Sequence, residues 1–273
     1  WQHGPHRQGI GFVFDKVVAD ATGWNSKTEA YAIGAVMCLA LLVAIYLKGR
    51  LFGSLSYWDA AIPLMFFTPV QFEIWAGTLN PSHGSFPLLL AVAYCVSWTL
   101  GDNRVKYAAI LLINFFLIHT GFGLFMGFIT PVLLLQDCHQ TLQRRQTSQL
   151  VYSFSALFLS LVSVSSFFVG YTFAPAVDCF QFPNPNLLAY PSFIGVMFAD
   201  YFGIKGHDFT TALLGMGLFV LSTVVFLYHA RILLKEGVSS RHVSLVVTIL
   251  VGYSLLFSLT TAVGRVCLGI EAG

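Results

Sequence analysis

Long uncharged stretches alternate with short polar segments along the whole chain. Four stretches without Asp, Glu, Lys or Arg have roughly the length of 20 residues that crosses a hydrocarbon core as a helix. They cover residues 30–47, 150–171, 209–230 and 243–264. None of them keeps the strict alternation of a membrane β-strand. The pattern therefore predicts an all-α, polytopic bundle of transmembrane helices.

Four further passes are predicted with less regular patterns, over residues 60–79, 86–101, 105–119 and 121–136. The first contains Glu73 and two prolines. The last two come from one uncharged stretch, 107–136, which as a single helix would be about 45 Å long and exceed a hydrocarbon core of about 30 Å. Glycines near its middle favour two helices that meet near residues 120–123.

The distribution of basic residues supports this division, because Lys and Arg concentrate in short cytoplasmic loops. Nine of the 14 basic residues form four clusters: Lys48/Arg50, Arg104/Lys106, Arg144/Arg145 and Arg231/Lys235/Arg241. With two helices in 107–136, all four clusters fall on one side of the membrane. The predicted topology has about eight passes, with residues 1–29 and 265–273 on the non-cytoplasmic side.

Two outer segments have helical patterns of their own. Apolar residues recur at spacings of three and four in the first, at Val13, Val17, Ala21 and Trp24. This pattern predicts a short amphipathic helix that lies in the membrane interface or, equally, packs on other outer loops. The second segment, 191–204, is apolar but short, which predicts an interfacial or re-entrant helix.

Composition excludes a water-soluble domain of ordinary kind. The chain is 56% hydrophobic and 10% charged, whereas soluble domains have about 25% charged residues. The net charge of +2 and the lack of a long basic run argue against nucleic acid as a partner. The lipid bilayer is the expected partner, and the oligomeric state is left open.

The five cysteines are scattered without the CxxC spacing of metal or redox motifs. Cys179 and Cys267 could face the same compartment, so a disulfide between them stays open. The sequence also has no P-loop, HExxH, GxSxG or dinucleotide-binding fingerprint. No inverted repeat is evident, which weakens a secondary-transporter interpretation.

The candidate catalytic residues are Glu73 and His83, because ionisable groups within membranes tend to mark functional sites. Gln71 and Asn80 lie beside them in the sequence and are candidate substrate-binding residues. A carboxylate, an imidazole and amides near one membrane face could bind a polar substrate. The alternative is that Glu73 sits at the interface and satisfies a helix end.

His6, Arg7 and Arg265 are candidate ligands for an anionic group, since the arginine fork suits phosphate and carboxylate. The alternative for each is an exposed charge near lipid headgroups, and Glu271 is close enough in sequence to pair with Arg265. Asn114 and His119 are expected to be hydrogen-bond links between helices. One of the outer aspartates, Asp178, Asp200 or Asp208, could serve as a general base.

Several short motifs together resemble bacterial polytopic membrane proteins related to the GT-C class of polyprenyl-phosphate-dependent glycosyltransferases. They are Gly4-Pro5-His6-Arg7 with Trp24-Asn25, Pro69-Val70-Gln71-Phe72-Glu73-Ile74-Trp75, Thr120-Gly121-Phe122-Gly123-Leu124, and Gly264-Arg265-Val266-Cys267-Leu268-Gly269-Ile270-Glu271-Ala272. In relatives the last motif continues into Ser-Arg-Tyr and further helices, so the chain is expected to be a piece of a longer protein. The resemblance spans most of the chain.

The resemblance implies an enzyme of the bacterial inner membrane that takes a sugar from a polyprenyl-phosphate donor at the non-cytoplasmic face. Arg7 and Arg265 would bind the phosphate, with a divalent metal as a further possible stabilising group, and Glu73 or His83 would act on the acceptor side. The acid expected early in the first outer loop would precede Trp1, and Asp15 and Asp20 do not match it. The alternatives are a transporter or flippase and a non-catalytic membrane scaffold.

Overall fold

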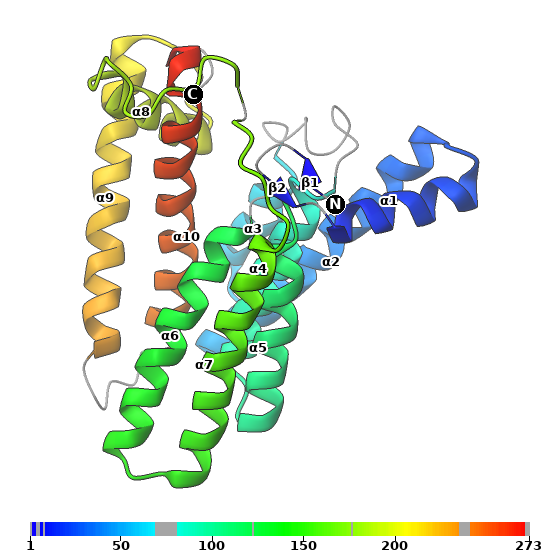
Figure 1. Cartoon of the computed structure of the whole chain (residues 1–273), viewed down its shortest axis with the longest axis vertical. Helices are drawn as coiled ribbons and strands as arrows, with labels where there is room; N and C mark the ends of the chain where they lie inside the picture. The colour runs from blue at the N-terminus through cyan, green and yellow to red at the C-terminus, as the bar shows by residue number, and fades with distance from the viewer. Residues whose placement is uncertain are drawn as a thin grey trace. The chain divides into compact units, whose positions relative to one another are not determined.

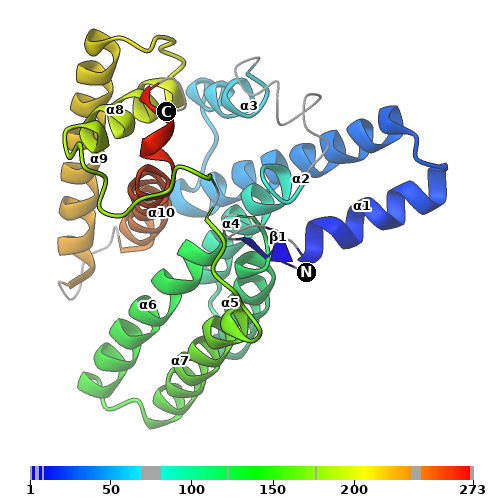
Figure 2. The same cartoon turned by 45° about the horizontal axis from the view of Figure 1, so that its top comes forward.

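A computed structural model describes residues 2–3, 6–7, 9–68, 81–121, 123–175, 177–234 and 241–270. The chain forms two compact units, Trp1–Tyr171 and Thr172–Gly273 (Figures 1 and 2). Apart from a small antiparallel ribbon of β1 (Gln2–His3) and β2 (His6–Arg7), the regular elements of the described residues are helices. The all-α prediction is confirmed for this part of the chain.

The first unit contains the helices up to residue 168. They are α1 (Gly9–Thr22), α2 (Ser26–Phe52), a 3-10 helix (Tyr57–Ala60), α3 (Ala61–Phe66), α4 (Ser85–Trp98), α5 (Asn103–Ile118), α6 (Leu124–Gln143) and α7 (Thr147–Phe168). The second unit contains α8 (Ala189–Tyr201), α9 (Phe209–Leu234), α10 (Arg241–Arg265) and a 3-10 helix (Val266–Leu268).

Four of the described helices are long and apolar enough to cross a membrane: α2, α7, α9 and α10 with its 3-10 extension. They coincide with the four clearest uncharged stretches of the sequence. Large apolar side chains on α2, α7 and α9 are more than half exposed, as at Leu42 (62%), Phe158 (61%) and Val224 (57%). Contiguous apolar surface of this kind suits a lipid solvent. The chain is an integral membrane protein.

The other predicted passes are less uniform, so the count of eight remains a prediction. Helices α4 and α5 have 14 and 16 residues, which gives about 21 and 24 Å of helix. The segment 60–79 is not one helix, because α3 ends at Phe66. Pro69 follows closely, and a proline disfavours helical backbone in the residue before it. Residues 69–80 lie outside the described part of the chain.

The division of residues 107–136 into two helices is confirmed. α5 ends at Ile118 and α6 begins at Leu124. Their side chains pair in antiparallel register, since Thr130 Oγ1 donates to Asn114 Oδ1 at 2.8 Å and Lys106 lies 3.0 Å from Asp137. Gly123 makes the turn possible, because a Cβ at this position would lie 1.5 Å from the Leu117 carbonyl oxygen.

Polar side chains join the core of the first unit. Asn114 and Thr130 are completely buried, and Tyr94 OH lies 2.9 Å from Thr130 Oγ1. Because the Thr130 hydroxyl donates to Asn114, Tyr94 is the donor to Thr130. The chain of hydrogen bonds therefore runs from α4 through α6 to α5, and the expectation that Asn114 links helices is confirmed.

The three basic clusters of the first unit lie at the same end of its bundle. Arg50 Nη2 donates to the Thr99 carbonyl at 2.7 Å, which joins the end of α2 to the end of α4. Arg104 Nε donates to Tyr152 OH at 2.8 Å, and the Lys106–Asp137 pair joins α5 to α6. The Arg144/Arg145 cluster forms the turn between α6 and α7. We call this the basic end of the first unit.

In the second unit, α8 and α9 meet backbone against backbone. A Cβ at Gly215 would lie 1.7 Å from the Gly195 carbonyl oxygen, and a Cβ at Gly195 would lie 2.1 Å from that of Ala212. Phe193, Met197 and Phe198 of α8 join Leu255 and Ala262 of α10 in one apolar core. A helix is thus present close to the predicted 191–204, and its interfacial or re-entrant position remains a prediction.

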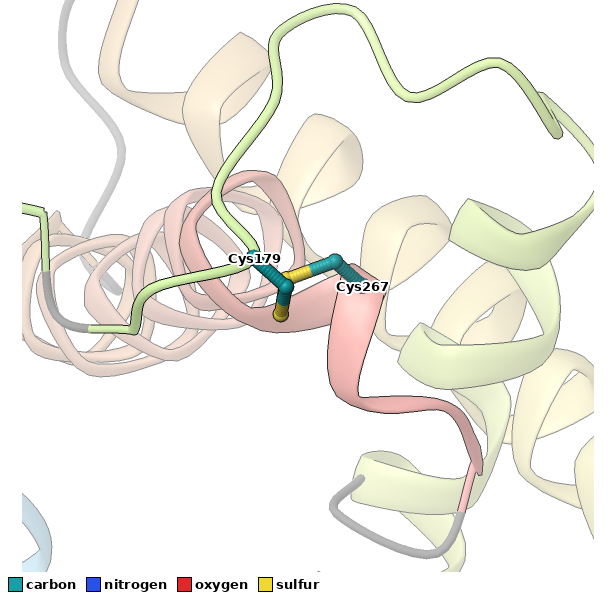
Figure 3. Close-up of a disulfide and its surroundings, with 2 residues drawn as sticks. All are labelled: Cys179 and Cys267. Atoms are coloured by element: carbon teal, nitrogen blue, oxygen red, sulfur yellow. A yellow bond between two sulfur atoms is a disulfide. The ribbon is translucent and has the colours of Figure 1, made fainter.

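A disulfide joins Cys179, in the loop before α8, to Cys267, in the 3-10 helix after α10 (Figure 3). The two Cα atoms are 5.8 Å apart and 88 residues separate them in sequence. Helix α10 runs from Arg241 to Arg265, and the disulfide lies just beyond its Arg265 end. Within the second unit, the disulfide and the basic connection of α9 to α10 are therefore at opposite ends of α10.

Candidate functional site

Of the seven predicted site residues, the structure describes the side chains of Arg7, His83 and Arg265. Gln71, Glu73 and Asn80 lie outside the described residues. The backbone of His6 belongs to strand β2, and its side chain lies outside the description. The predictions for these four residues therefore stay predictions.

Arg7 lies at the end of helix α7. Its guanidinium donates to the Val169 carbonyl and stands 5.7 Å from the centre of the Phe167 ring. Val169 is the C-cap residue of α7, and the last carbonyls of a helix lack partners within it and attract cations. The sequence places an arginine where a helix end and an aromatic face both favour positive charge.

The remaining hydrogen-bonding capacity of Arg7 is the notable feature of this contact. The Nε atom is buried and has no hydrogen-bond partner among the described residues. No carboxylate in the described part of the chain forms an ion pair with Arg7. Leaving a buried donor unpaired costs about 1–3 kcal/mol. An anion that approaches the accessible part of this guanidinium would balance its charge.

His83 belongs to a tight junction of three chain segments. Gly121 N donates to the Ser82 carbonyl at 2.9 Å. A Cβ at Gly121 would lie 2.2 Å from His83 Cδ2, so the imidazole rests directly on this glycine. A Cβ at Gly11 would lie 1.6 Å from Ser82 Oγ, which brings helix α1 onto the same turn. Only glycine allows these two close approaches, and together they fix the position of His83.

His119 lies beside this junction, because a Cβ at Gly9, the first residue of α1, would lie 3.9 Å from the His119 carbonyl oxygen. Its Nδ1 is 2.9 Å from the Phe115 carbonyl of its own helix, and its ring centre is 6.4 Å from that of Phe167. Phe167 thus contacts both Arg7 and His119. The hydrogen bond of His119 thus stays within α5, and the ring contact with Phe167 connects His119 to α7.

We call Arg7, Ser82, His83, His119, Phe167 and Tyr171 the Arg7 cluster. Burial raises the pKa of Tyr171, and the charge of Arg7 opposes that rise. Phe167, Tyr171 and His119 were not among the predicted site residues. A usable signal was present, because Phe167 and Tyr171 are four residues apart where an uncharged stretch ends, and aromatic residues concentrate at membrane interfaces.

The Arg7 cluster and the basic end lie at opposite ends of the first unit. α5 begins near Arg104 and Lys106 and ends at Ile118, immediately before His119. The 13 residues from Lys106 to His119 correspond to about 20 Å of helix. α7 likewise runs from Tyr152 near the basic end to Phe167 in the Arg7 cluster. Charge is therefore distributed in two separate layers.

Arg265 belongs to the second unit, where it is exposed at the last position of α10. It is the N-cap of the 3-10 helix that carries Cys267. Glu271, its predicted partner, lies outside the described residues. Arg265 is thus at the disulfide end of its own unit, away from the basic connection between α9 and α10.

Several carboxylates serve local structure. Asp208 caps α9 by accepting from Thr211 N at 2.7 Å, and this hydrogen bond holds the pKa of Asp208 below its usual range. Asp200 pairs with Lys205 at 3.7 Å. The low pKa of Asp208 and the ion pair of Asp200 make these two carboxylates poor general bases.

Asp15 differs from the other carboxylates. Burial, together with the charge of Glu29 at the start of α2, raises the pKa of Asp15 to about 6. A carboxyl group that titrates close to neutral pH is suited to exchange protons. Asp15 lies on α1, whose Gly11 contacts Ser82 of the Arg7 cluster. No sequence pattern indicates this raised pKa, which depends on the packing of α1 against α2.

Metal binding has no support in the described residues, where no three His, Cys, Asp or Glu side chains come together as ligands. A divalent metal therefore remains a prediction. Comparison with protein-family models, with curated proteins and with solved structures gives no match to this chain.

Proposed function

We propose that the chain belongs to a membrane enzyme of the GT-C glycosyltransferase kind, which binds a lipid-linked sugar phosphate at the non-cytoplasmic face. The observation that carries the proposal is the Arg7 cluster. It contains a half-buried cation that has no acidic partner among the described residues, two imidazoles and two aromatic rings, at the end of the unit opposite the basic clusters. These groups suit the phosphate of a polyprenyl donor.

Two independent features support a site on the non-cytoplasmic face. Basic residues concentrate in short cytoplasmic connections, which assigns the basic end of the first unit and the α9–α10 connection to the cytoplasm. Disulfides persist in oxidising compartments, which assigns Cys179 and Cys267 to the other side. Within the second unit the two assignments agree, because the disulfide and the basic connection lie at opposite ends of α10. A bacterial inner membrane fits both.

In the proposed reaction, an acceptor hydroxyl attacks the anomeric carbon of the sugar. The hydroxyl proton passes to Glu73 or His83 as general base. The bond between the anomeric carbon and the phosphate oxygen breaks, and its electron pair leaves with polyprenyl phosphate. Arg7 would stabilise the charge on this leaving group, and the phosphate-binding role predicted for Arg265 is tested separately below. The cluster position of His83, beside Gly121 and Ser82, supports a fixed imidazole in this role.

The first test is binding of a polyprenyl-phosphate sugar to the full chain in lipid nanodiscs. Arg7→Gln removes the charge with little change in size, and we expect binding weaker by about tenfold to a hundredfold, as for loss of a charged hydrogen bond. Arg104→Gln is the matched control, because Arg104 is bound to Tyr152 at the basic end. Arg265→Gln tests the second assigned arginine in the same assay.

The results also separate the alternatives. Saturable binding that Arg7→Gln weakens, followed by sugar transfer to an acceptor, supports the enzyme. Binding with translocation of the lipid and no transfer would favour a flippase. If wild type and both Arg7→Gln and Arg265→Gln bind the donor equally, the phosphate assignment is wrong. No binding of any polyprenyl-phosphate sugar would favour a scaffold.

A further inference from the structure

A second feature of the first unit lies at the basic end, far from the Arg7 cluster. Helices α6 and α7 leave between them a groove of about 540 Å³, and its lining includes Leu135, Cys138, Leu142, Val151, Phe154 and Ser155. Most of these side chains are apolar. Leu142, Val151 and Phe154 are 60%, 61% and 64% exposed, so no other part of the described chain covers them.

Unpaired positive charge stands at the mouth of this groove. The turn between α6 and α7 carries Arg144 and Arg145, both exposed, and neither has an acidic partner among the described residues. Asp137, the nearest acid along α6, is already paired with Lys106 at 3.0 Å. The free charge at the groove is therefore positive.

The dimensions of the groove and the turn match a lipid. From Leu135 to Arg144 the helix rises about 14 Å, so an acyl chain in the groove would place its headgroup level with the arginines. Arg145 has a left-handed backbone, with φ of 56°, and closes the end of α6 by donating its N–H to the Leu142 carbonyl. This turn holds both arginines beyond the helix end, beside the mouth of the groove.

We propose that this groove is a binding site for an anionic phospholipid, with one acyl chain between α6 and α7 and the phosphate at Arg144 and Arg145. Charge complementarity selects an anionic headgroup, since basic residues at the cytoplasmic ends of membrane helices attract such lipids. Apolar side chains at membrane depth select the acyl chain. This site is separate from the proposed donor site and binds a lipid of the bilayer itself.

The test uses the full chain, reconstituted in nanodiscs that contain equal amounts of phosphatidylglycerol and phosphatidylcholine. Native mass spectrometry then counts the lipids that remain bound. We expect the wild type to retain phosphatidylglycerol preferentially. The double change Arg144→Gln and Arg145→Gln should lower this preference by roughly thirtyfold, the effect of removing two charges near the surface. The matched control is Arg231→Gln with Arg241→Gln, in the second unit.

A second variant tests the groove without altering charge. Ser155→Phe fills it from α7, and we expect several-fold less retained phosphatidylglycerol. Ser165→Phe, an exposed position on the same helix outside the groove, should bind like the wild type. The folding control is the unfolding temperature in phosphatidylcholine. If that of Ser155→Phe differs from that of the wild type, Val151→Phe is tested in its place.

Loss of preference in the arginine variant together with loss of retention in the groove variant supports the site. Equal retention of the two lipids by the wild type overturns it. Unchanged retention in the groove variant also overturns it, because the arginines would then act only as a diffuse surface charge.

Discussion

In the first unit, buried side chains join the helices through hydrogen bonds and ion pairs, as at Tyr94–Thr130–Asn114 and Lys106–Asp137. In the second unit, backbone meets backbone at Gly195 and Gly215, and a disulfide closes the loop before α8. The polar links depend on single atoms, whereas the glycine contact depends on the lack of any side chain. The two units should therefore respond differently to substitution.

The difference also bears on function. The first unit places its polar groups in layers, with basic residues at one end, the Asn114 hydrogen bonds in the core and the Arg7 cluster at the other end. In the second unit, the small residues of α8 and α9 allow close contact without polar side chains, as is common between membrane helices. Candidate chemistry is accordingly concentrated in the first unit.

The largest effect is expected from removing the disulfide. Cross-linking two residues that are 88 positions apart lowers the conformational entropy of the unfolded chain. In the loop-entropy account this stabilises the folded state by about 4–5 kcal/mol. Cys179→Ser with Cys267→Ser should lower the thermal unfolding temperature of the second unit, and added reductant should not lower it further. Measurement by light scattering and thiol labelling in detergent would show this.

The control for the disulfide is Cys38→Ser, since Cys38 is an exposed free cysteine in the first unit. It should unfold like the wild type. An unchanged unfolding temperature in the double serine variant would show that packing of α8, and not the covalent bond, holds the loop.

A smaller effect is expected from Gly215→Ala. The added methyl would lie 1.7 Å from the Gly195 carbonyl oxygen, a backbone atom, so α8 and α9 must separate. Such overpacking costs about 1–3 kcal/mol. Gly217→Ala lies two residues further on the same helix, where nothing is within 4 Å of the added Cβ. If both variants unfold at the same temperature, the glycine contact does not hold the second unit together.

The smallest effect is expected from Thr130→Val in the first unit. The substitution keeps the shape and leaves Tyr94 OH and Asn114 Oδ1 without their shared hydroxyl. We expect a loss of about 1 kcal/mol, in the range for hydrogen bonds between membrane helices. Thr260→Val is the control, because its hydroxyl bonds within its own helix and is exposed. A neutral Thr130→Val would mean that the polar links of the first unit contribute little.

Helix positions could be predicted because lipid requires long uncharged runs, and the division between α5 and α6 followed from length and from the placement of basic residues. The end of α3 at Phe66 was missed, although Pro69 gave a local signal. The contact between Gly195 and Gly215 could not be predicted, since glycines in apolar helices do not indicate which of them face each other.

The candidate site was predictable only in part. Arg7 and His83 could be selected by residue type, but the contacts with Phe167 and Gly121 arise from segments that are distant in sequence. His119 was predicted only as a hydrogen-bond link between helices, because its contact with Phe167 depends on the packing of α5 against α7. The raised pKa of Asp15 likewise arises from burial between helices, which a sequence pattern does not measure.

The disulfide has a consequence for the order in which the protein is made. Cys179 is synthesised before α8, α9 and α10, and Cys267 follows all three. The bond can close only after both long helices have entered the bilayer and Cys267 has reached the compartment that already holds Cys179. A chain in which α10 failed to cross would keep two free thiols on opposite sides of the membrane. A closed disulfide therefore indicates that the last helix, α10, has crossed the membrane.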